Sequence, residues 1–281
     1  PDSQSSLIAL GLALTATAPQ QARDILQKAL DLSKKPSPMR LSVGLAQTLC
    51  ALGQHEQALE VLHAAVESHG DEPSLRIGIA NAHLGLGYRK DWADVLLPLF
   101  PAQDGQPALA INSQADLPVL DIFTPAQGLQ PVEVDAAAPL VAVVMTAYNA
   151  ADTIAQAMRS VLAQTYAKLR LVVVDDVSTD ATLAVVRGIA QQDPRVIILQ
   201  QRENAGTYVA KNQALSLVHA DYYTFLDSDD LMHPDRIAAH LSFMTRNPEV
   251  VCSYSRWIRI APQGEVVVLP QENPASCFLR R

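Results

Sequence analysis

The sequence predicts a helical repeat unit over residues 1–100 and an α/β unit with a mostly parallel sheet over residues 139–281. Two observations predict this. In the first hundred residues, apolar side chains recur at the three- and four-residue spacing of a helix. From residue 140 onward, short β-branched runs alternate four times with amphipathic segments of helical period. Such alternation is typical of a parallel sheet covered by helices on both faces.

Composition limits the class of protein. The chain has 281 residues, of which 49% are hydrophobic and 18% charged, as expected for about two globular domains. The net charge of −8 argues against a nucleic-acid partner, because such proteins usually carry a basic excess. Cys50, Cys252 and Cys277 lie far apart and suggest no disulfide framework, which is typical of a reducing compartment.

A membrane-spanning segment is not expected, because no uninterrupted apolar stretch reaches about 18 residues. Residues 7–18 are apolar and end in small side chains, as in a secretory signal. However, no Lys or Arg precedes them, which favours a buried helix. We expect a cytoplasmic protein, or one that is peripheral at the inner membrane face.

The helical unit contains a weak internal repeat. Pro38 and Pro73 are each predicted to open a helix, and Gly53 and Gly87 are predicted to lie in turns 34 residues apart. This period resembles that of tetratricopeptide repeats, with small residues such as Ala58 placed for close helix packing. The resemblance implies a protein partner bound by the repeats. A plain helical bundle would explain the same periodicity.

Residues 101–138 change in character and are rich in Pro, Ala, Gln and Asp. This composition predicts a linker that packs in part on its neighbours.

The α/β unit is predicted as four strand–helix pairs followed by a hairpin. The predicted strands cover residues 140–146, 169–175, 196–200 and 222–226, and the predicted helices cover residues 153–163, 181–191, 208–219 and 234–247. The hairpin is predicted from strands 249–260 and 265–269 around a turn at 262–264.

Polar residues follow all four predicted parallel strands, at residues 146–149, 175–180, 204–207 and 227–230. Each group alone could be a helix cap. In an open parallel sheet, however, ligands bind beyond the carboxyl ends of the strands, which lie at one edge. Four polar groups at that edge therefore predict a ligand site.

Asp227, Asp229 and Asp230 are the sharpest feature of this edge. Three carboxylates so close together repel one another unless a cation lies between them. Mg²⁺ and Mn²⁺ prefer oxygen ligands, and they complete one or two protein carboxylates with phosphate oxygens and water. The alternative is a solvated acidic turn with a helix cap before Pro234.

Four further residues fit a nucleotide at this edge. Asp176 can accept an N–H from a pyrimidine or bond a ribose hydroxyl, and Tyr148 can offer an aromatic face to a base. Gly206 permits close backbone approach, and Lys211 could lie near a diphosphate. The alternatives are a helix cap for Asp176, a core-edge aromatic for Tyr148 and a solvated helix lysine for Lys211.

These residues resemble the motifs of family 2 glycosyltransferases, which have the GT-A fold, a Rossmann-like, mostly parallel sheet. The resemblance covers residues 138–281 and runs in order through residues 141–149, 160–166, 173–180, 204–212 and 225–230. It implies an inverting, metal-dependent glycosyltransferase that moves a sugar from a nucleotide sugar, most often a UDP-sugar, to a glycan or glycoconjugate acceptor. It also implies bacterial polysaccharide biosynthesis and a D-x-D motif that holds Mn²⁺ or Mg²⁺.

Carried over by position, the resemblance implies a role for each residue. Thr146 and Tyr148 line the uracil pocket, and Asp176 accepts the N–H of the base. Asp227 contacts the ribose or the metal, and Asp229 ligates the metal. The nucleotide-sugar-binding set also includes Ala147, Gly206, Lys211 and Ser228. Lys211 stands where the family usually has Arg.

The resemblance also implies a missing residue. The family's general base lies further along the chain than the segment resembling residues 276–281, and nothing follows Arg281. We therefore expect a donor-binding half with little or no transferase activity, since positioned proton transfer contributes about 10²–10⁴-fold. One alternative is a helical-repeat protein-interaction module with a degenerate nucleotide-binding domain. A weaker one is a nucleotidyltransferase, although no Gly-rich basic phosphate loop follows the first strand.

Overall fold

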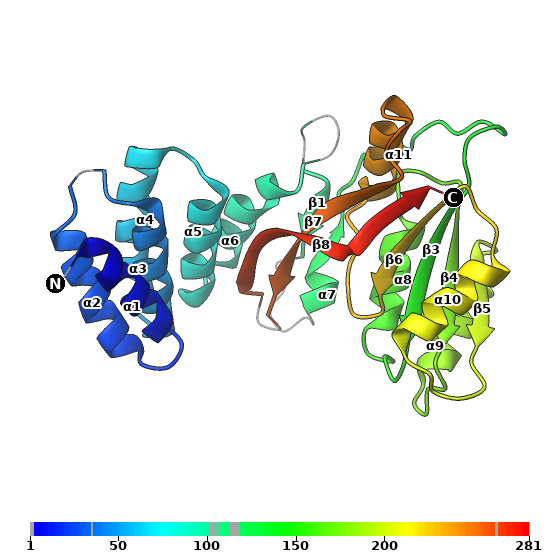
Figure 1. Ribbon diagram of the computed structural model, residues 1–281, viewed down its shortest axis with the longest axis horizontal. Coiled ribbons are helices and arrows are strands. Elements are labelled where there is room, and N and C mark those ends of the chain that lie inside the picture. Colours follow the sequence, from blue (N-terminus) through cyan, green and yellow to red (C-terminus); the bar gives the residue numbers. More distant parts are fainter. Residues whose placement is uncertain are drawn as a thin grey trace. The chain divides into compact units, whose positions relative to one another are not determined.

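The computed structural model describes residues 3–34, 36–101, 105, 107–112, 119–261 and 264–280 (Figure 1). The chain forms two compact units. The first contains Pro1–Leu99 and Arg259–Leu269, and the second contains Phe100–Ile258 and Pro270–Arg281. The domain limits at residues 100 and 138 stay a prediction.

Helices run in succession through the first unit (blue to cyan in Figure 1). Each packs against the next along the chain, and α3 also packs against α5. Their bounds are α1 Gln4–Leu14, α2 Pro19–Asp31, α3 Met39–Ala51, α4 His55–His69, α5 Pro73–Gly85, α6 Arg89–Leu96 and the 3₁₀ turn η1 Leu97–Leu99. Residues 7–14 of the apolar segment at 7–18 lie in α1.

Two helix–helix turns confirm the predicted repeat. Gly53 and Gly87 have φ values of +73° and +79°, a conformation that favours glycine after a helix. The Gln54 N–H donates to Leu49 O at 2.8 Å, and the Tyr88 N–H donates to His83 O at 2.9 Å. The same hydrogen bond thus recurs 34 positions later along the chain.

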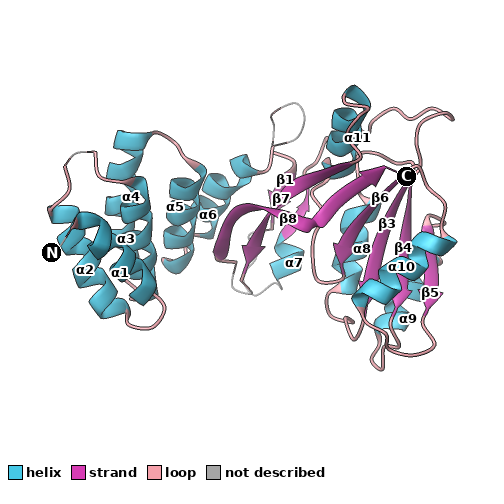
Figure 2. Ribbon diagram, viewed as in Figure 1, coloured by secondary structure: helices cyan, strands magenta, loops and turns pink. Residues whose placement is uncertain are grey.

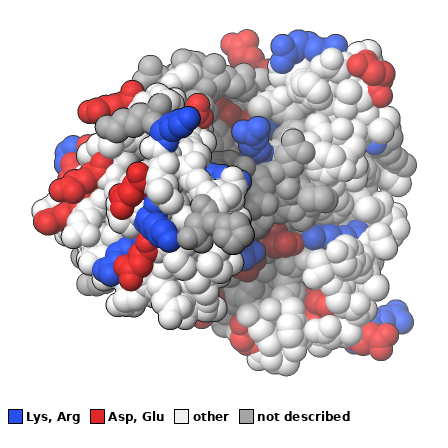
Figure 3. Space-filling model, turned by 60° about the vertical axis from the view of Figure 1, so that its left-hand side comes forward, with Lys and Arg blue, Asp and Glu red and all other residues white. Residues whose placement is uncertain are grey.

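The helical unit has a core rich in leucine and pairs charges on its surface. Its core contains Leu26, Leu45 and Leu62, and Ala58 of α4 is fully buried in it. Oppositely charged side chains pair on the surface, and blue and red side chains are interspersed on the face in Figure 3. These pairs are Arg23–Asp24, Arg76–Asp71 and Lys90–Asp94.

The tip of the last hairpin belongs to this first unit. Asn81 on α5 donates its side-chain N–H to Val266 O at 2.8 Å and accepts the Val266 N–H at 2.9 Å. Gly264, with φ +98°, lies so close to Trp92 that a Cβ would approach the indole to 3.4 Å. Burial, with a smaller contribution from Glu265, raises the pKa of the Cys50 thiol to about 11. The helices therefore hold the tip by its main chain.

The segment predicted as a linker contains short regular elements. β1 Leu109–Ile111 pairs antiparallel with β2 Phe123–Pro125, and the short helix α7 Val119–Ile122 precedes β2. The sequence analysis missed these strands because three-residue runs are too short to show a period.

The second unit contains a six-stranded sheet in the order β5-β4-β3-β6-β8-β7 (Figure 2). β3 pairs parallel with β4 and β6, β4 pairs parallel with β5, and β6 pairs antiparallel with β8. The strands are β3 Val141–Ala147, β4 Leu169–Asp175, β5 Val196–Gln200, β6 Tyr222–Asp227, β7 Cys252–Ile260 and β8 Val266–Arg280. The helices are α8 Ile154–Leu162, α9 Thr182–Ala190, α10 Thr207–Leu217 and α11 Arg236–Arg246. The predicted mostly parallel α/β sheet is confirmed.

Two apolar layers cover the parallel strands. On one face, Val143 and Met145 of β3 pack with residues of α8, α9 and α11. On the other, Ala142 and Val144 pack with Ala210 and Ala214 of α10. All seven residues of β3 are buried, as expected for a central strand covered on both sides.

The second strand of the hairpin differs from its prediction. β8 continues to Arg280 instead of ending at residue 269, and Phe278 pairs with Thr224 of β6. Pro270 and Pro274 argue against a strand in the local sequence, and only the long-range pairing with β6 reveals it. Of the predicted turn at 262–264, residues 262 and 263 lie outside the described residues.

No helix in the described ranges is both long enough and apolar enough to cross a bilayer.

A buried histidine predicts a pH dependence of stability. His240 stacks on Phe278 with ring centroids 5.0 Å apart, and its Nδ1 lies 2.7 Å from the Ser253 hydroxyl. Burial and, to a smaller extent, Arg236 lower its pKa to about 4. Between pH 6.5 and 4 the unfolded chain therefore binds a proton that the folded chain does not, so stability falls as the pH falls through this window. The total loss is about 3 kcal/mol.

Urea unfolding at pH 7 and pH 4.5 tests this expectation. His240→Gln keeps a hydrogen-bonding group but cannot titrate, so its stability should fall less between the two pH values, by about 2 kcal/mol. Equal losses in the variant and the wild type would contradict the assignment.

Candidate functional site

The carboxyl ends of the parallel strands bring the predicted polar groups to one edge of the sheet, as the arrangement in Figure 2 shows. In the strand register, Thr146 of β3 lies opposite Asp227 of β6. Ala147, the last residue of β3, lies opposite Asp175 of β4. The polar residues that follow these strands therefore start from neighbouring positions.

Hydrogen bonds join the ends of β3 and β4. The Asn149 side-chain oxygen accepts the Thr179 N–H at 2.8 Å, and the Asn149 N–H donates to the Ser178 hydroxyl at 3.1 Å. Asn149 and Val177 have φ values of 49° and 65°. A positive φ at a β-branched residue such as Val177 is strained, and such strain persists only where the surroundings enforce it.

Asp176 joins the end of β4 to the loop before α10. One of its carboxylate oxygens accepts the Ala205 N–H at 3.0 Å, and the other accepts the Gly206 N–H at 2.9 Å. Gly206, the residue before α10, has a φ of +83°, a backbone conformation that favours glycine. Asp176 is 4% exposed, and each carboxylate oxygen retains a second lone pair. Asp176 is thus held in place while it can still accept another hydrogen bond.

The two predicted base-pocket residues on β3 and its loop differ in exposure. Thr146 is buried, whereas Tyr148 is 53% exposed. Half the surface of the Tyr148 side chain is therefore open, so the alternative of a core-edge aromatic is not favoured.

Lys211 joins α10 to the end of β6. Its Nζ lies 3.1 Å from Asp227 Oδ1 and 5.4 Å from the centroid of the Phe225 ring. Its side chain is 14% exposed, so it is not the solvated helix lysine of the alternative interpretation. Hydrogen bonds and one ion pair thus connect the four predicted polar groups, from β3 through β4 and α10 to β6.

The carboxylates of the acidic turn after β6 differ in solvent exposure. Asp227 and Ser228 are half-buried, whereas Asp229 and Asp230 are exposed. Within the described ranges, no group of three or more His, Cys, Asp or Glu side chains forms a metal centre. A Mg²⁺ or Mn²⁺ site that takes phosphate oxygens needs only one or two protein carboxylates. The oxygen donors of Asp227 and Asp229 fit that chemistry.

Arg236 is a residue of this region that the sequence analysis missed. It is the first residue of α11, where the helix dipole disfavours a cation, and this unusual position was the available signal. Its guanidinium donates to the Thr224 hydroxyl at 3.1 Å, and that hydroxyl donates to Cys277 O at 2.8 Å. Burial lowers the pKa of Arg236 to about 10, although Cys277 and Asp230 oppose the shift. Arg236 remains a cation behind the acidic turn at neutral pH.

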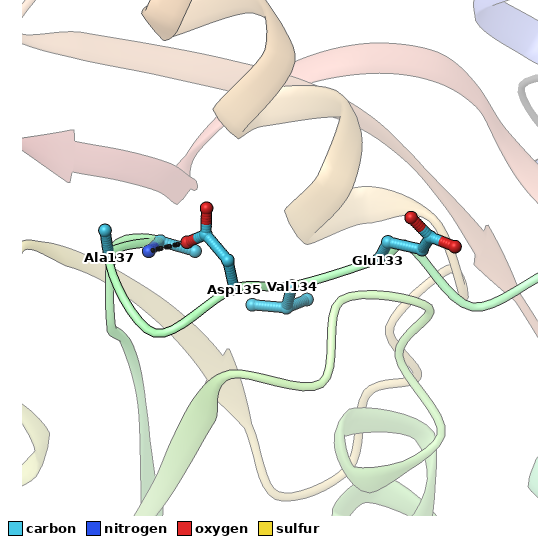
Figure 4. Close-up of a pocket in the computed structure, with 5 residues that line it drawn as sticks. Glu133, Val134, Asp135 and Ala137 are labelled. Atoms are coloured by element: carbon cyan, nitrogen blue, oxygen red, sulfur yellow. Dashed lines mark hydrogen bonds between the residues drawn. The ribbon is translucent and has the colours of Figure 1, made fainter.

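A cavity of about 560 Å³ lies elsewhere in the second unit, along residues 133–138 (Figure 4). In this cavity the Asp135 carboxylate accepts the Ala138 N–H at 2.7 Å. Lys168, just before β4, donates to carbonyl oxygens of the same segment. The cavity therefore borders the amino ends of β3 and β4, opposite the polar edge, and we assign it no ligand.

Comparisons with known proteins agree with both units. Residues 142–269 match the family model "Glycosyl transferase family 2", and residues 13–87 match the model "Tetratricopeptide repeat".

Three relatives of the chain come from bacteria. The putative teichuronic acid biosynthesis glycosyltransferase TuaG of Bacillus subtilis is 38% identical over 42% of this chain and 45% of its own length. The succinoglycan biosynthesis protein ExoO of Rhizobium meliloti is 38% identical over 47% of this chain and 40% of its own length. The Escherichia coli enzyme WfaP is named UDP-Glc:alpha-D-GlcNAc-diphosphoundecaprenol beta-1,3-glucosyltransferase. It is 36% identical over 42% of this chain and 46% of its own length. The chain thus spans less than half the length of each of these relatives.

Proposed function

We propose that this chain, whose residues 142–269 belong to glycosyl transferase family 2 and follow a tetratricopeptide repeat, binds the nucleotide-sugar donor of an inverting, metal-dependent glycosyltransferase. The favoured donor is a UDP-sugar, and the acceptor is a glycan or glycoconjugate of a bacterial polysaccharide pathway. The names of TuaG, ExoO and WfaP support this class of reaction.

The hydrogen-bonded edge formed by β3, β4, α10 and β6 carries this proposal. Asp176 is held by two backbone N–H groups, and Lys211 is held by Asp227. Binding groups that are already ordered lose little conformational freedom when a ligand arrives. A chain that used these residues only as helix caps would not need contacts from one strand end to the next.

Each residue has a defined part in donor binding. The exposed Tyr148 ring stacks against the base, and the free lone pairs of Asp176 accept the N–H of uracil. Lys211 and the backbone beside Gly206 face the diphosphate at the start of α10, where N–H groups favour an anion. These groups hold the leaving nucleotide while the sugar is exposed to an acceptor.

Asp229, with Asp227, would hold the divalent ion. When bound, Mn²⁺ or Mg²⁺ offsets the negative charge that develops on the departing nucleoside diphosphate. Asp229 lies exposed on the turn after β6, where its carboxylate can reach a metal–diphosphate complex from solvent.

Calorimetric titration of the whole chain with UDP tests the proposal. In Mn²⁺ we expect saturable binding, and EDTA should weaken it by about tenfold or more, because the diphosphate would then meet the acidic turn without its metal. GDP and ADP serve as matched controls that share the diphosphate but not the uracil.

Two results would contradict the proposal. Equal UDP affinity with Mn²⁺ and with EDTA would exclude the metal from donor binding. Failure of every nucleotide to bind would instead favour the helical-repeat interaction module with a degenerate second domain.

A further inference from the structure

The ion pair between Lys211 and Asp227 occupies a carboxylate that the proposed function assigns to the ribose or metal region. Lys211 Nζ lies 3.1 Å from Asp227 Oδ1, and its side chain is 14% exposed. The Asp227 side chain is 46% exposed, so solvent still reaches the carboxylate. The ion pair therefore leaves part of the Asp227 side chain accessible to a ligand.

The surroundings make Lys211 more than an ordinary surface partner. An exposed Lys–Asp pair contributes little, because water screens both charges. The Lys211 side chain is largely shielded from water. The face of the Phe225 ring, with its centroid 5.4 Å from Nζ, offers a cation–π contact that replaces part of the lost hydration. A buried ammonium needs an anion beside it, and Asp227 is the anion that the structure supplies.

A divalent cation and Lys211 would compete for the same carboxylate. A metal ion at Asp227 places positive charge next to the ammonium, and like charges at short range repel strongly where water is scarce. The negative charge on the diphosphate of a nucleotide sugar would offset the repulsion between the metal ion and the Lys211 ammonium. The diphosphate also gains a further negative charge when the sugar leaves.

We propose that Lys211 is the resident counter-cation of Asp227 and that it exchanges this carboxylate for the diphosphate when the donor binds with its metal. This inference rests on the proposed function and adds to it an order of events at one residue. Lys211 neutralises Asp227 in the free protein. In the bound state the Lys211 ammonium would face the diphosphate, and Asp227 would be a ligand of the metal.

The exchange predicts two effects of opposite sign for Lys211→Met in the whole chain. Mn²⁺ alone should bind about tenfold more tightly, because its competitor is gone. UDP in saturating Mn²⁺ should bind about tenfold more weakly, because the diphosphate loses a cation. Free Mn²⁺ is measured by electron paramagnetic resonance, and UDP binding is measured by calorimetry.

Matched variants separate the exchange from general effects of charge and folding. Lys90→Met removes the same charge from another Lys–Asp pair, Lys90–Asp94, whose lysine is 83% exposed, and it should change neither affinity. Lys211→Arg keeps the cation and should stay close to wild type in both measurements. If Lys211→Met does not fold, Lys211→Gln replaces it.

A purely structural Lys211 would weaken both ligands or neither, and either result overturns the exchange. Tighter Mn²⁺ binding with unchanged UDP affinity also overturns it. If wild type binds UDP with Mn²⁺ normally while these signs are absent, the exchange fails and the proposed function stands. If wild type binds no UDP, the proposed function fails and the exchange fails with it.

Discussion

Asp229→Asn is expected to weaken UDP binding in the presence of Mn²⁺ by about a hundredfold, because a neutral amide is a poor ligand for a hard divalent cation. Asn keeps the shape of the side chain on the exposed turn after β6, so the fold should be retained. Calorimetry in Mn²⁺ gives the affinity. A parallel titration in EDTA should show no difference between the variant and wild type, because no metal is then present.

Asp152→Asn is the matched control for this prediction. Asp152 is an exposed carboxylate in the turn between β3 and α8, also at the carboxyl edge of the sheet. Asp152→Asn removes the same charge as Asp229→Asn, and we expect it to change UDP affinity by less than about threefold. Equal losses in the two variants would mean that the net charge of the edge, not ligation by Asp229, controls binding.

Asp176→Ala should have the second large effect, on both nucleotide binding and stability. It removes the acceptor of the Ala205 and Gly206 N–H groups and the proposed acceptor of the uracil N–H. Losing two part-buried hydrogen bonds to a charged acceptor should lower the free energy of unfolding by about 2 kcal/mol. UDP affinity should fall by about a hundredfold, because the loop before α10 loses its position and the base loses a partner.

Asp180→Ala distinguishes these two causes. The Thr182 hydroxyl and backbone N–H hold the pKa of the Asp180 carboxyl below its usual range, and Asp180 also accepts the Ala151 N–H. Asp180 is therefore another carboxylate that fixes loops at this edge, but no role toward the base is proposed for it. Urea unfolding should show destabilisation while UDP affinity stays close to wild type. A comparable loss of UDP affinity would make Asp176 a loop tether without a role in base recognition.

Local sequence patterns were sufficient for two of the parallel strands and for the helix–helix turns. Strands 169–175 and 196–200 were predicted with the bounds that the structure shows, because β-branched runs bounded by polar residues favour a strand over other secondary structure. Gly53 and Gly87 were identified from their 34-residue spacing, and both adopt the positive φ that favours glycine after a helix. In each case the deciding interactions lie within a few residues of sequence.

Contacts between distant parts of the chain could not be predicted from local sequence patterns. The extension of β8 to Arg280 depends on its register with β6, more than 50 positions earlier along the chain, and nearby prolines concealed it. At the site, strand order placed the polar groups at one edge, but it could not show that Lys211 meets Asp227 or that Asp176 holds the loop at Gly206. Those contacts depend on side-chain conformation and on which loops meet.

A crystal structure of the chain with UDP and Mn²⁺, with diffraction recorded at the manganese absorption edge, tests the central claim most directly. The expected result is an anomalous peak bonded to the Asp229 carboxylate, with uracil against Tyr148 and Asp176 and with the Lys211 ammonium turned to the diphosphate. No anomalous peak at the turn, together with no nucleotide between the ends of β3 and β6, would contradict the assignment of this edge as a donor site.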